Sequence, residues 1–194
     1  MTDGTTHQPL NENIKSICVF CGSGNGKNPA FISAAAALGA LLATRNIHLI
    51  FGGGDMGLMG AAAKAARGAG GQVTGIIPEF LLKYQNSELI KSETIITPDM
   101  HSRKAAMYAK ADGFIALPGG IGTLEELVET MTWEQLGQHT KPIILLNIEK
   151  FWQPFLKLLH HMNDEAFIRP GLEVNLHVID EVNDLKALLP DHSL

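Results

Sequence analysis

Short apolar runs alternate with longer segments of helical periodicity along almost the whole chain. This alternation is typical of βα units, in which parallel strands are joined by helices. Several of the runs consist almost entirely of Val, Ile, Leu and Phe, as expected of strands that are covered on both faces. The seven predicted strands are 14–20, 47–51, 72–77, 94–97, 113–117, 143–147 and 174–179.

The predicted helices fall between these strands, at 29–45, 58–68, 101–110, 122–136, 151–162 and 184–189. The order predicts one three-layer α/β domain, a Rossmann-like, doubly wound parallel sheet of about seven strands with helices on both faces. A chain of 194 residues is long enough to bury the core of such a domain. We assign the domain to residues 14–194 and interpret the polar residues 1–13 as a disordered tail.

Charge and hydropathy disfavour several classes of partner. The net charge of −5 argues against nucleic acid, whose phosphates attract basic surfaces. The most apolar stretch, residues 31–43, is shorter than the roughly 20 residues that cross a bilayer, and the first residues lack the pattern of a secretory signal. We therefore expect a cytoplasmic protein without a membrane or nucleic-acid partner. Cys18 and Cys21 form a C-x-x-C pair that starts inside a strand, and we interpret both as packing residues.

Four loops that follow predicted strands are unusual in composition. In doubly wound sheets, ligands bind beyond the carboxyl ends of the strands. Clustered glycines there let backbone N–H groups approach an anion closely. The loops read CGSGNGKNP, GGGDMGLMG, TPDMHSRK and PGGIGTLEE, and they follow the first, second, fourth and fifth strands. The sequence thus predicts a phosphate-binding site at this edge of the sheet.

Two standard phosphate-binding motifs match these loops poorly. The P-loop pattern is one residue short in CGSGNGKN, which also has Asn28 where a hydroxyl must bind Mg²⁺. The pattern G-x-G-x-x-G is met by Gly52, Gly54 and Gly57, but after the second strand and without an acidic residue ending the next one. An NTPase is disfavoured, and a NAD-dependent oxidoreductase stays open as an alternative.

The loop PGGIGTLEE allows two interpretations. Thr123 and Glu126 form the pattern T-x-x-E, which alone would be a capping box with Thr123 as N-cap. Three glycines exceed what capping needs, and with the helix dipole they favour an anion site with Glu126 one turn away. Arg103 and Lys104 stand at the start of another predicted helix, where cations oppose the dipole, so local stabilisation does not explain them.

In this order and spacing, GGGDMGLMG, MHSRK and PGGIGTLEE resemble the LOG ("lonely guy") family of cytokinin riboside 5′-monophosphate phosphoribohydrolases, whose members are also labelled lysine decarboxylases. The resemblance covers residues 17–147, including TWEQLG and KPIILLN. It implies a homodimer that hydrolyses the N-glycosidic bond of a purine nucleoside 5′-monophosphate, of cytokinin or adenosine type, to the base and ribose 5-phosphate. No metal or cofactor is expected. A decarboxylase would need a lysine Schiff base with pyridoxal phosphate, of which the sequence has no other element.

The resemblance also implies roles for individual residues, with Arg103 and Glu126 as the catalytic pair. The residues expected to bind the substrate or its phosphate are Ser23, Gly53, Gly54, Gly57, Lys104, Gly119, Gly120, Gly122, Thr123 and Thr132. Glu79 and Met100 are candidate contacts to the base. The main alternative is a non-catalytic nucleotide or cofactor carrier of the same fold, which would keep the glycine loops without needing both members of the pair.

Overall fold

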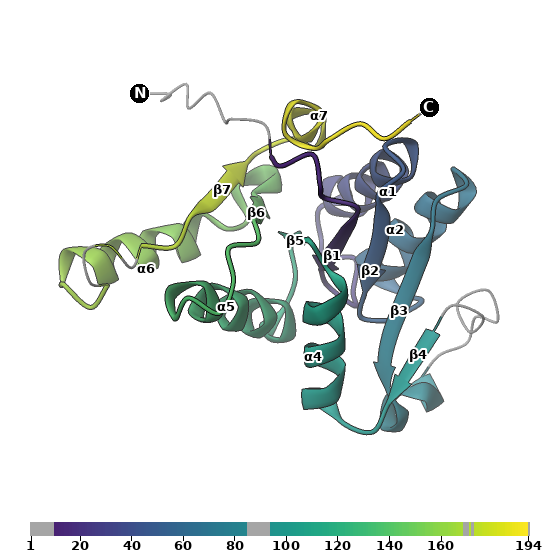
Figure 1. Ribbon diagram of the computed structural model, residues 1–194, viewed down its shortest axis with the longest axis horizontal. Helices are drawn as coiled ribbons and strands as arrows, with labels where there is room; N and C mark the ends of the chain where they lie inside the picture. Colours follow the sequence, from purple (N-terminus) through teal and green to yellow (C-terminus); the bar gives the residue numbers. More distant parts are fainter. Residues whose placement is uncertain (1–9, 85–93, 169–170, 172, 194) are drawn as a thin grey trace.

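The computed structural model describes residues 10–84, 94–168, 171 and 173–193. Within this part of the chain, seven strands form one parallel sheet in the order β4-β3-β2-β1-β5-β6-β7 (Figure 1). The strands are β1 (Ser16–Phe20), β2 (His48–Phe51), β3 (Val73–Pro78), β4 (Thr94–Thr97), β5 (Gly113–Ala116), β6 (Ile143–Leu146) and β7 (Leu176–Ile179). The predicted parallel sheet is confirmed, and each predicted strand is present with its ends shifted by at most two residues.

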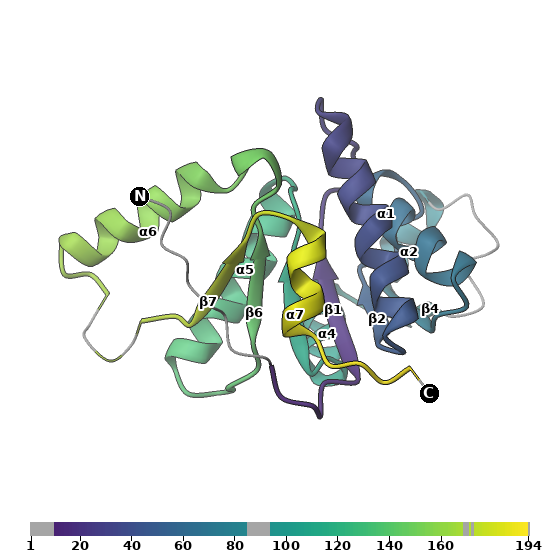
Figure 2. The same ribbon diagram turned by 90° about the horizontal axis from the view of Figure 1, so that it is seen from above.

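Helices cover both faces of the sheet, as predicted. Helices α1, α2 and α7 share one hydrophobic cluster with the sheet, and α4, α5 and α6 share the other (Figures 1 and 2). Their bounds are α1 (Pro29–Thr44), α2 (Gly57–Gly68), α4 (Met100–Lys110), α5 (Ile121–Gln135), α6 (Gln153–Asp164) and α7 (Leu185–Leu188). Short 3₁₀ helices, η1 (Glu79–Tyr84), η2 (Ile148–Lys150) and η3 (Val182–Asp184), complete the described elements.

Strand β1 lies at the centre of the sheet, and all five of its residues are buried. Its side chains alternate between the two faces, so Cys18 belongs to the α4–α5–α6 cluster and Val19 to the α1–α2–α7 cluster. Cys18 and Cys21 are both buried free thiols, which confirms their interpretation as packing residues.

The packed structure begins at Leu10 rather than after residue 13. The backbone N–H of Leu10 donates to the carbonyl of Leu188 at 2.9 Å, and its side chain packs against the core cluster. One apolar residue in an otherwise polar stretch is enough to anchor the chain to α7. The first nine residues of the predicted tail lie outside the described residues.

The order of the strands reverses between β1 and β5. The chain moves from β1 to β2, β3 and β4 on one side, and from β5 to β6 and β7 on the other. Val19 pairs with Ile115, and Phe20 pairs with Ala116, so the two strands end side by side. Loops that leave such a switch point in opposite directions open a crevice between them, where ligands of this fold class bind.

Close packing between α1 and α2 depends on Gly39. A Cβ at this position would lie 2.1 Å from the carbonyl oxygen of Ala62 on α2. We predict that Gly39→Ala lowers the free energy of unfolding by about 1–3 kcal/mol, because the two backbones would have to separate. Gly68→Ala is the matched control, since a Cβ there meets nothing within 4 Å. Urea denaturation measures both, and an unchanged stability for Gly39→Ala would contradict the close approach.

Candidate active site

Three of the four unusual loops are joined by backbone contacts at the switch point. The N–H of Gly22, after β1, donates to the carbonyl of Pro118, after β5, at 3.1 Å. The carbonyl of Gly22 accepts from Leu58 at the start of α2, also at 3.1 Å. Gly57 has φ +60°, and a Cβ there would lie 2.3 Å from the carbonyl oxygen of Ser23. Glycine at position 57 therefore lets the loop after β2 lie directly against the loop after β1.

The first turn of α5 presents free backbone donors to this crevice. Gly120 is the N-cap and supplies no side-chain cap, and the helix's first internal hydrogen bond runs from Leu124 N–H to the Gly120 carbonyl at 3.0 Å. The N–H groups of residues 121–123 precede that bond, so they have no acceptor within the helix. A Cβ at Gly119 would lie 2.1 Å from Oγ1 of Thr123, so the loop needs glycine there to fold onto the helix.

The capping-box interpretation of T-x-x-E is wrong. Thr123 lies within the helix rather than at its N-cap, which is Gly120. Glu126 does not turn back to the N-cap but bonds to a side chain of another helix. The N-cap is thus three residues earlier than the capping pattern suggested, at position 120 instead of 123. The side chains of Thr123 and Glu126 are therefore not used in capping and line the cleft.

Arg103 and Glu126 form a buried ion pair between α4 and α5. Nη1 of Arg103 donates to Oε1 of Glu126 at 2.8 Å, and their side chains are only 9% and 11% exposed. Nε of Arg103 donates to the carbonyl of Ile76 in β3 at 3.1 Å, which fixes the guanidinium plane. A Cβ at Gly52 would lie 2.2 Å from Nη2, so the guanidinium needs a glycine there. These bonds use Nε, Nη1 and Oε1, which leaves Nη2 and Oε2 for a ligand.

The electrostatics of Glu126 are set by two opposing effects. Burial raises the pKa of its carboxyl group above the ordinary glutamate value, because the charged form loses hydration. The positive charge of Arg103 and its hydrogen bond lower this pKa and so oppose the effect of burial. Burial also raises the pKa of the nearby Cys21 thiol, which is therefore a neutral group at physiological pH. The cleft thus holds a desolvated carboxyl group whose charge depends on Arg103.

A cleft of about 280 Å³ connects the ion pair with the start of α5. Val19, Cys21 and Met59 give it an apolar wall. Its complete lining is Val19, Cys21, Gly22, Ser23, Gly52, Met59, Arg103, Gly120, Ile121, Gly122, Thr123 and Glu126. Backbone donors at one end, a carboxylate and a guanidinium beside them, and an apolar wall can hold an anionic ligand that also has a nonpolar part.

The structure brings six of the expected site residues to the lining of this cleft: Ser23, Arg103, Gly120, Gly122, Thr123 and Glu126. The other expected residues lie outside the lining: Gly53, Gly54, Gly57, Glu79, Met100, Lys104, Gly119 and Thr132. Their role in binding substrate stays a prediction. Thr132 is exposed and donates to the carbonyl of Val128 within α5, and Glu79 is exposed in η1. Gly57 instead allows the close approach to the backbone of Ser23, and Gly119 the close approach to the side chain of Thr123, described above.

The ammonium group of Lys104 bonds to two acidic residues other than Glu126. Its Nζ donates to Oε1 of Glu125 at 2.5 Å and to Oε1 of Glu129 at 2.9 Å, both on α5. These contacts and the Arg103–Glu126 pair join α4 to α5 through two adjacent side chains. They explain why two cations are placed near the start of α4 against its dipole.

Sequence reasoning missed six lining residues: Val19, Cys21, Gly22, Gly52, Ile121 and Met59. Gly52 belongs to a glycine pattern that the sequence showed, but its close approach to Arg103 is a long-range contact. Cys21 and Gly22 follow a predicted strand directly, and that position was the available signal. Nothing in the sequence around Met59 distinguishes it from a core residue of α2.

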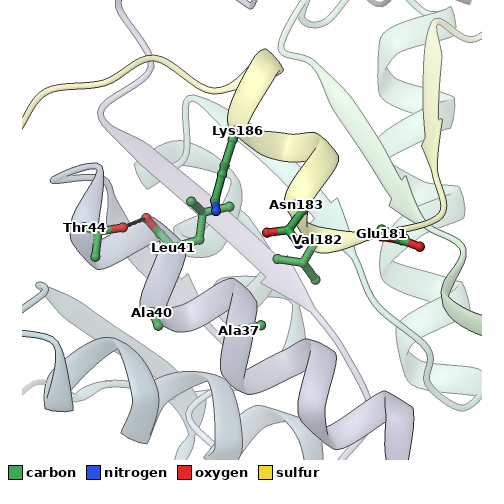
Figure 3. A pocket seen from close by; sticks show the side chains of 8 residues that line it. All are labelled: Ala37, Ala40, Leu41, Thr44, Glu181, Val182, Asn183 and Lys186. Atoms are coloured by element: carbon green, nitrogen blue, oxygen red, sulfur yellow. Dashed lines mark hydrogen bonds between the residues drawn. The ribbon is translucent and has the colours of Figure 1, made fainter.

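A second hollow lies away from this cleft and shares no residue with it. Figure 3 shows the groove, about 330 Å³, between α1 and the segment formed by η3 and α7. It is lined by Ala37, Ala40, Leu41, Thr44, Glu181, Val182, Asn183 and Lys186. The groove lacks the glycine loops and the buried ion pair, so we place the candidate active site at the switch point.

Two negative findings apply to the described residues. Within the ranges given above, no group of three or more His, Cys, Asp or Glu side chains is arranged to hold a metal ion. In the same part of the chain, no helix has both the length and the apolar character needed to span a membrane.

Fold and cleft together define the class of protein. It is a doubly wound α/β protein with a helix start whose first N–H groups face a cleft and with a buried Arg–Glu pair at the switch point. Residues 59–189 match the model of a family described as "Possible lysine decarboxylase". Curated proteins that resemble the chain are named as cytokinin riboside 5′-monophosphate phosphoribohydrolases. The chain belongs to this family, the LOG family, as its motifs suggested.

The relatives align with most of the chain. Identity is 47% with LOG7 of Arabidopsis thaliana, over 81% of this chain and 72% of the relative. Identity is 42% with LOG1 of the same plant, over 93% of this chain and 83% of LOG1. The probable enzyme LOGL2 of Oryza sativa subsp. japonica is 46% identical over 81% of this chain, and the match spans 65% of the rice protein.

Solved structures share the fold. The molybdenum cofactor binding protein of Rippkaea orientalis has a TM-score of 0.65 at 23% identity, covering 94% of this chain and 95% of its own. The molybdenum cofactor carrier protein of Chlamydomonas reinhardtii has a TM-score of 0.61 at 23% identity, and the match covers 91% of this chain and 92% of the carrier protein. At these identities the likeness concerns the architecture alone.

The raised pKa of Glu126 predicts a pH-dependent stability. A carboxyl group whose pKa is higher in the folded than in the unfolded state stabilises the fold while it is protonated. That contribution to the free energy of unfolding is lost as the pH rises from the pKa of the unfolded state through the pKa of the folded state. Relative to Glu126→Gln, the parent protein should lose stability as the pH rises from about 4.5. Urea denaturation of both proteins between pH 4 and 8 measures the difference. A constant difference would show that burial does not shift the Glu126 pKa.

Proposed function

We propose that the chain hydrolyses the N-glycosidic bond of a purine nucleoside 5′-monophosphate, of adenosine or cytokinin type, and releases the free base and ribose 5-phosphate. The observation that carries this proposal is the buried Arg103–Glu126 pair beside the free N–H groups of α5. The names of the relatives at 42–47% identity support the same activity. A carrier would need the anion site but not a desolvated carboxylate next to it.

The 5′-phosphate is assigned to the first turn of α5. Three N–H groups, at residues 121–123, and the positive end of the helix dipole would bind its oxygens. Ser23, across the crevice, adds a hydroxyl from the loop after β1. With the phosphate there, the ribose reaches Glu126 one turn along the same helix. The apolar wall formed by Val19, Cys21 and Met59 is then available to the base or the sugar ring.

Glu126 acts on the sugar in this proposal. When the bond between C1′ and the base nitrogen breaks, its electron pair leaves with the base and positive charge develops on the ribose ring. The Glu126 carboxylate stabilises that charge and orients the water whose oxygen bonds to C1′. The water proton passes to Glu126, and the departing base gains a proton from the site or from solvent. No metal or cofactor is needed for this sequence of steps.

Arg103 has two roles in the proposal. It keeps Glu126 ionised in a desolvated site, and its free Nη2 binds a ribose hydroxyl or a phosphate oxygen. The bond from Nε to the Ile76 carbonyl holds the guanidinium in one plane while Nη1 is on Glu126. A lysine ammonium has no such planar fork, so lysine does not replace Arg103.

We also propose that the protein acts as a homodimer through the exposed side of α5. Ile121, Val128 and Leu136 are exposed apolar residues along this helix and its C-cap, and grouped apolar side chains of this kind mark interaction surfaces. Ile121 also lines the cleft, so a second copy on this surface would border the site. Sedimentation equilibrium distinguishes the dimer from a monomer.

A cytoplasmic location is part of the proposal. Cys18 and Cys21 are free thiols in the core, as is usual for proteins of reducing compartments. The substrate class, a nucleoside monophosphate, is also an intracellular metabolite. Fractionation of the source cells tests this assignment.

The decisive assay offers AMP, isopentenyl-AMP, GMP and CMP in parallel and separates the products by chromatography. We expect free adenine or its prenylated form together with ribose 5-phosphate. Glu126→Gln and Arg103→Lys should lower kcat/KM by about 10²–10⁴, because each removes a charge or geometry needed at the reacting centre. These substitutions keep polar side chains, since removing one member of a buried pair outright costs about 3–5 kcal/mol of stability.

Glu134→Gln is the matched control for these variants. Glu134 lies on the same helix, α5, but outside the lining of the cleft, and its replacement should leave turnover unchanged. Near-parental activity in Glu126→Gln would contradict the catalytic assignment. A protein that binds AMP and returns it intact would be a carrier, and the proposal would fail.

A further inference from the structure

Met59 places a thioether in the cleft of the candidate active site. It lies in the first turn of α2, and its backbone N–H donates to the carbonyl of Gly22 at 3.3 Å. Its side chain is half-buried and lines the same cleft as Arg103 and Glu126. A small molecule that enters the cleft from water therefore reaches the sulfur of Met59.

The sulfur of Met59 lies over two glycines of the loop after β2. A Cβ at Gly54 would lie 3.3 Å from Sδ of Met59 and 3.1 Å from its Cε. A Cβ at Gly52 would lie 3.2 Å from the same Sδ and 2.2 Å from Nη2 of Arg103. The sulfur and Nη2 thus converge on the space beside Cα of Gly52.

The chemistry of the sulfur decides whether Nη2 of Arg103 is available to a ligand. The bonds of Arg103 to the Ile76 carbonyl and to Glu126 use Nε and Nη1 and leave Nη2 for the substrate. A thioether is only a weak hydrogen-bond acceptor, so Met59 leaves this donor available. Oxidation to the sulfoxide makes the side chain polar, and an oxygen that accepts from a guanidinium forms a strong, charge-assisted hydrogen bond.

The other methionines of the described chain lie outside the cleft. They are Met56, Met100, Met107, Met131 and Met162. Met107 and Met131 are buried, whereas Met56, which precedes the start of α2, is 63% exposed. Met56 therefore reports what oxidation of an accessible methionine does when its sulfur is not part of the cleft.

We propose that Met59 is an oxidation site that inactivates the protein: hydrogen peroxide converts its thioether to a sulfoxide, whose oxygen accepts a hydrogen bond from Nη2 of Arg103 and displaces the substrate. In this step one peroxide oxygen bonds to the sulfur as the O–O bond breaks. The sulfur is oxidised, and the peroxide is reduced to water. The inference rests on the proposed hydrolase function, because hydrolysis of the nucleotide is the activity that is lost.

The test treats the full-length protein with hydrogen peroxide and follows each methionine by peptide mass spectrometry, together with kcat/KM for AMP. Conversion of Met59 to the sulfoxide should lower kcat/KM at least about tenfold, because a hydrogen bond from a charged donor to the substrate is lost. Bound AMP should slow both the oxidation of Met59 and the loss of activity, since it occupies the cleft.

Two leucine variants assign the effect to one sulfur. Met59→Leu removes the thioether and keeps a similar apolar volume. Its kcat/KM, compared before and after the same treatment, should not fall. Met56→Leu is the matched control and should be inactivated as fast as the parent protein. Equal inactivation of Met59→Leu and the parent would overturn the inference.

Cys21 is another sulfur in the cleft, and reduction distinguishes it from Met59. Burial raises the pKa of the Cys21 thiol, so the thiolate that reacts with peroxide is scarce. Dithiothreitol reduces a sulfenic acid or a disulfide, whereas a methionine sulfoxide needs the reductases specific for its two epimers. Activity should return with these reductases and not with dithiothreitol alone. Recovery with dithiothreitol alone would place the effect on cysteine and overturn the inference.

Failure of the proposed function gives a different result from failure of this inference. If the untreated protein releases no base from any nucleotide offered, the hydrolase proposal fails. The oxidation is then tested by AMP binding in isothermal titration calorimetry. Binding should weaken at least about tenfold in the oxidised parent, for the same lost hydrogen bond, and stay unchanged in treated Met59→Leu. Complete conversion of Met59 with unchanged AMP binding would overturn the role of the sulfoxide.

Discussion

The structure depends on keeping one carboxylate charged where water is largely excluded. Glu126 is about nine-tenths buried, and taking an ionised carboxylate out of water is expensive unless a charged partner bonds to it. Arg103 is that partner, and much of the surrounding chain serves its position. The Ile76 carbonyl holds Nε, and the missing side chain of Gly52 makes room for Nη2. A site that only bound a nucleotide would not need this arrangement.

The fold brings the pair to the place where an anion can bind. The reversal of strand order between β1 and β5 puts the loops after these strands side by side. Gly22 and Gly57 let the loops after β1, β2 and β5 approach one another to backbone distance, and Gly119 lets the loop after β5 fold onto Thr123 of α5. The first turn of α5 then faces the crevice with its N–H groups free, and Glu126 follows one turn later. The free N–H groups and the carboxylate are thus separated by about one turn of the same helix.

The sheet could be predicted from the sequence because buried parallel strands are short runs of apolar residues and are therefore visible locally. The edge that carries the site was predictable for the same reason, since glycine-rich loops follow those runs. The individual side-chain contacts could not be predicted in this way. Thr123 matched a capping pattern that Gly120 overrides, and the partners of Lys104 lie about twenty residues away on another helix. Pairing between helices depends on their packing over the sheet, which no local pattern encodes.

The central claim is geometric: the helix start holds the 5′-phosphate, so that the side chain at position 126 meets C1′ of the ribose. A crystal structure of the Glu126→Gln variant with AMP tests it most directly, because the substitution slows turnover while keeping the side-chain shape. We expect phosphate oxygens within hydrogen-bond distance of the N–H groups of residues 121–123 and the Gln side chain beside C1′. A phosphate bound elsewhere, or a Gln side chain turned away from the sugar, would contradict it.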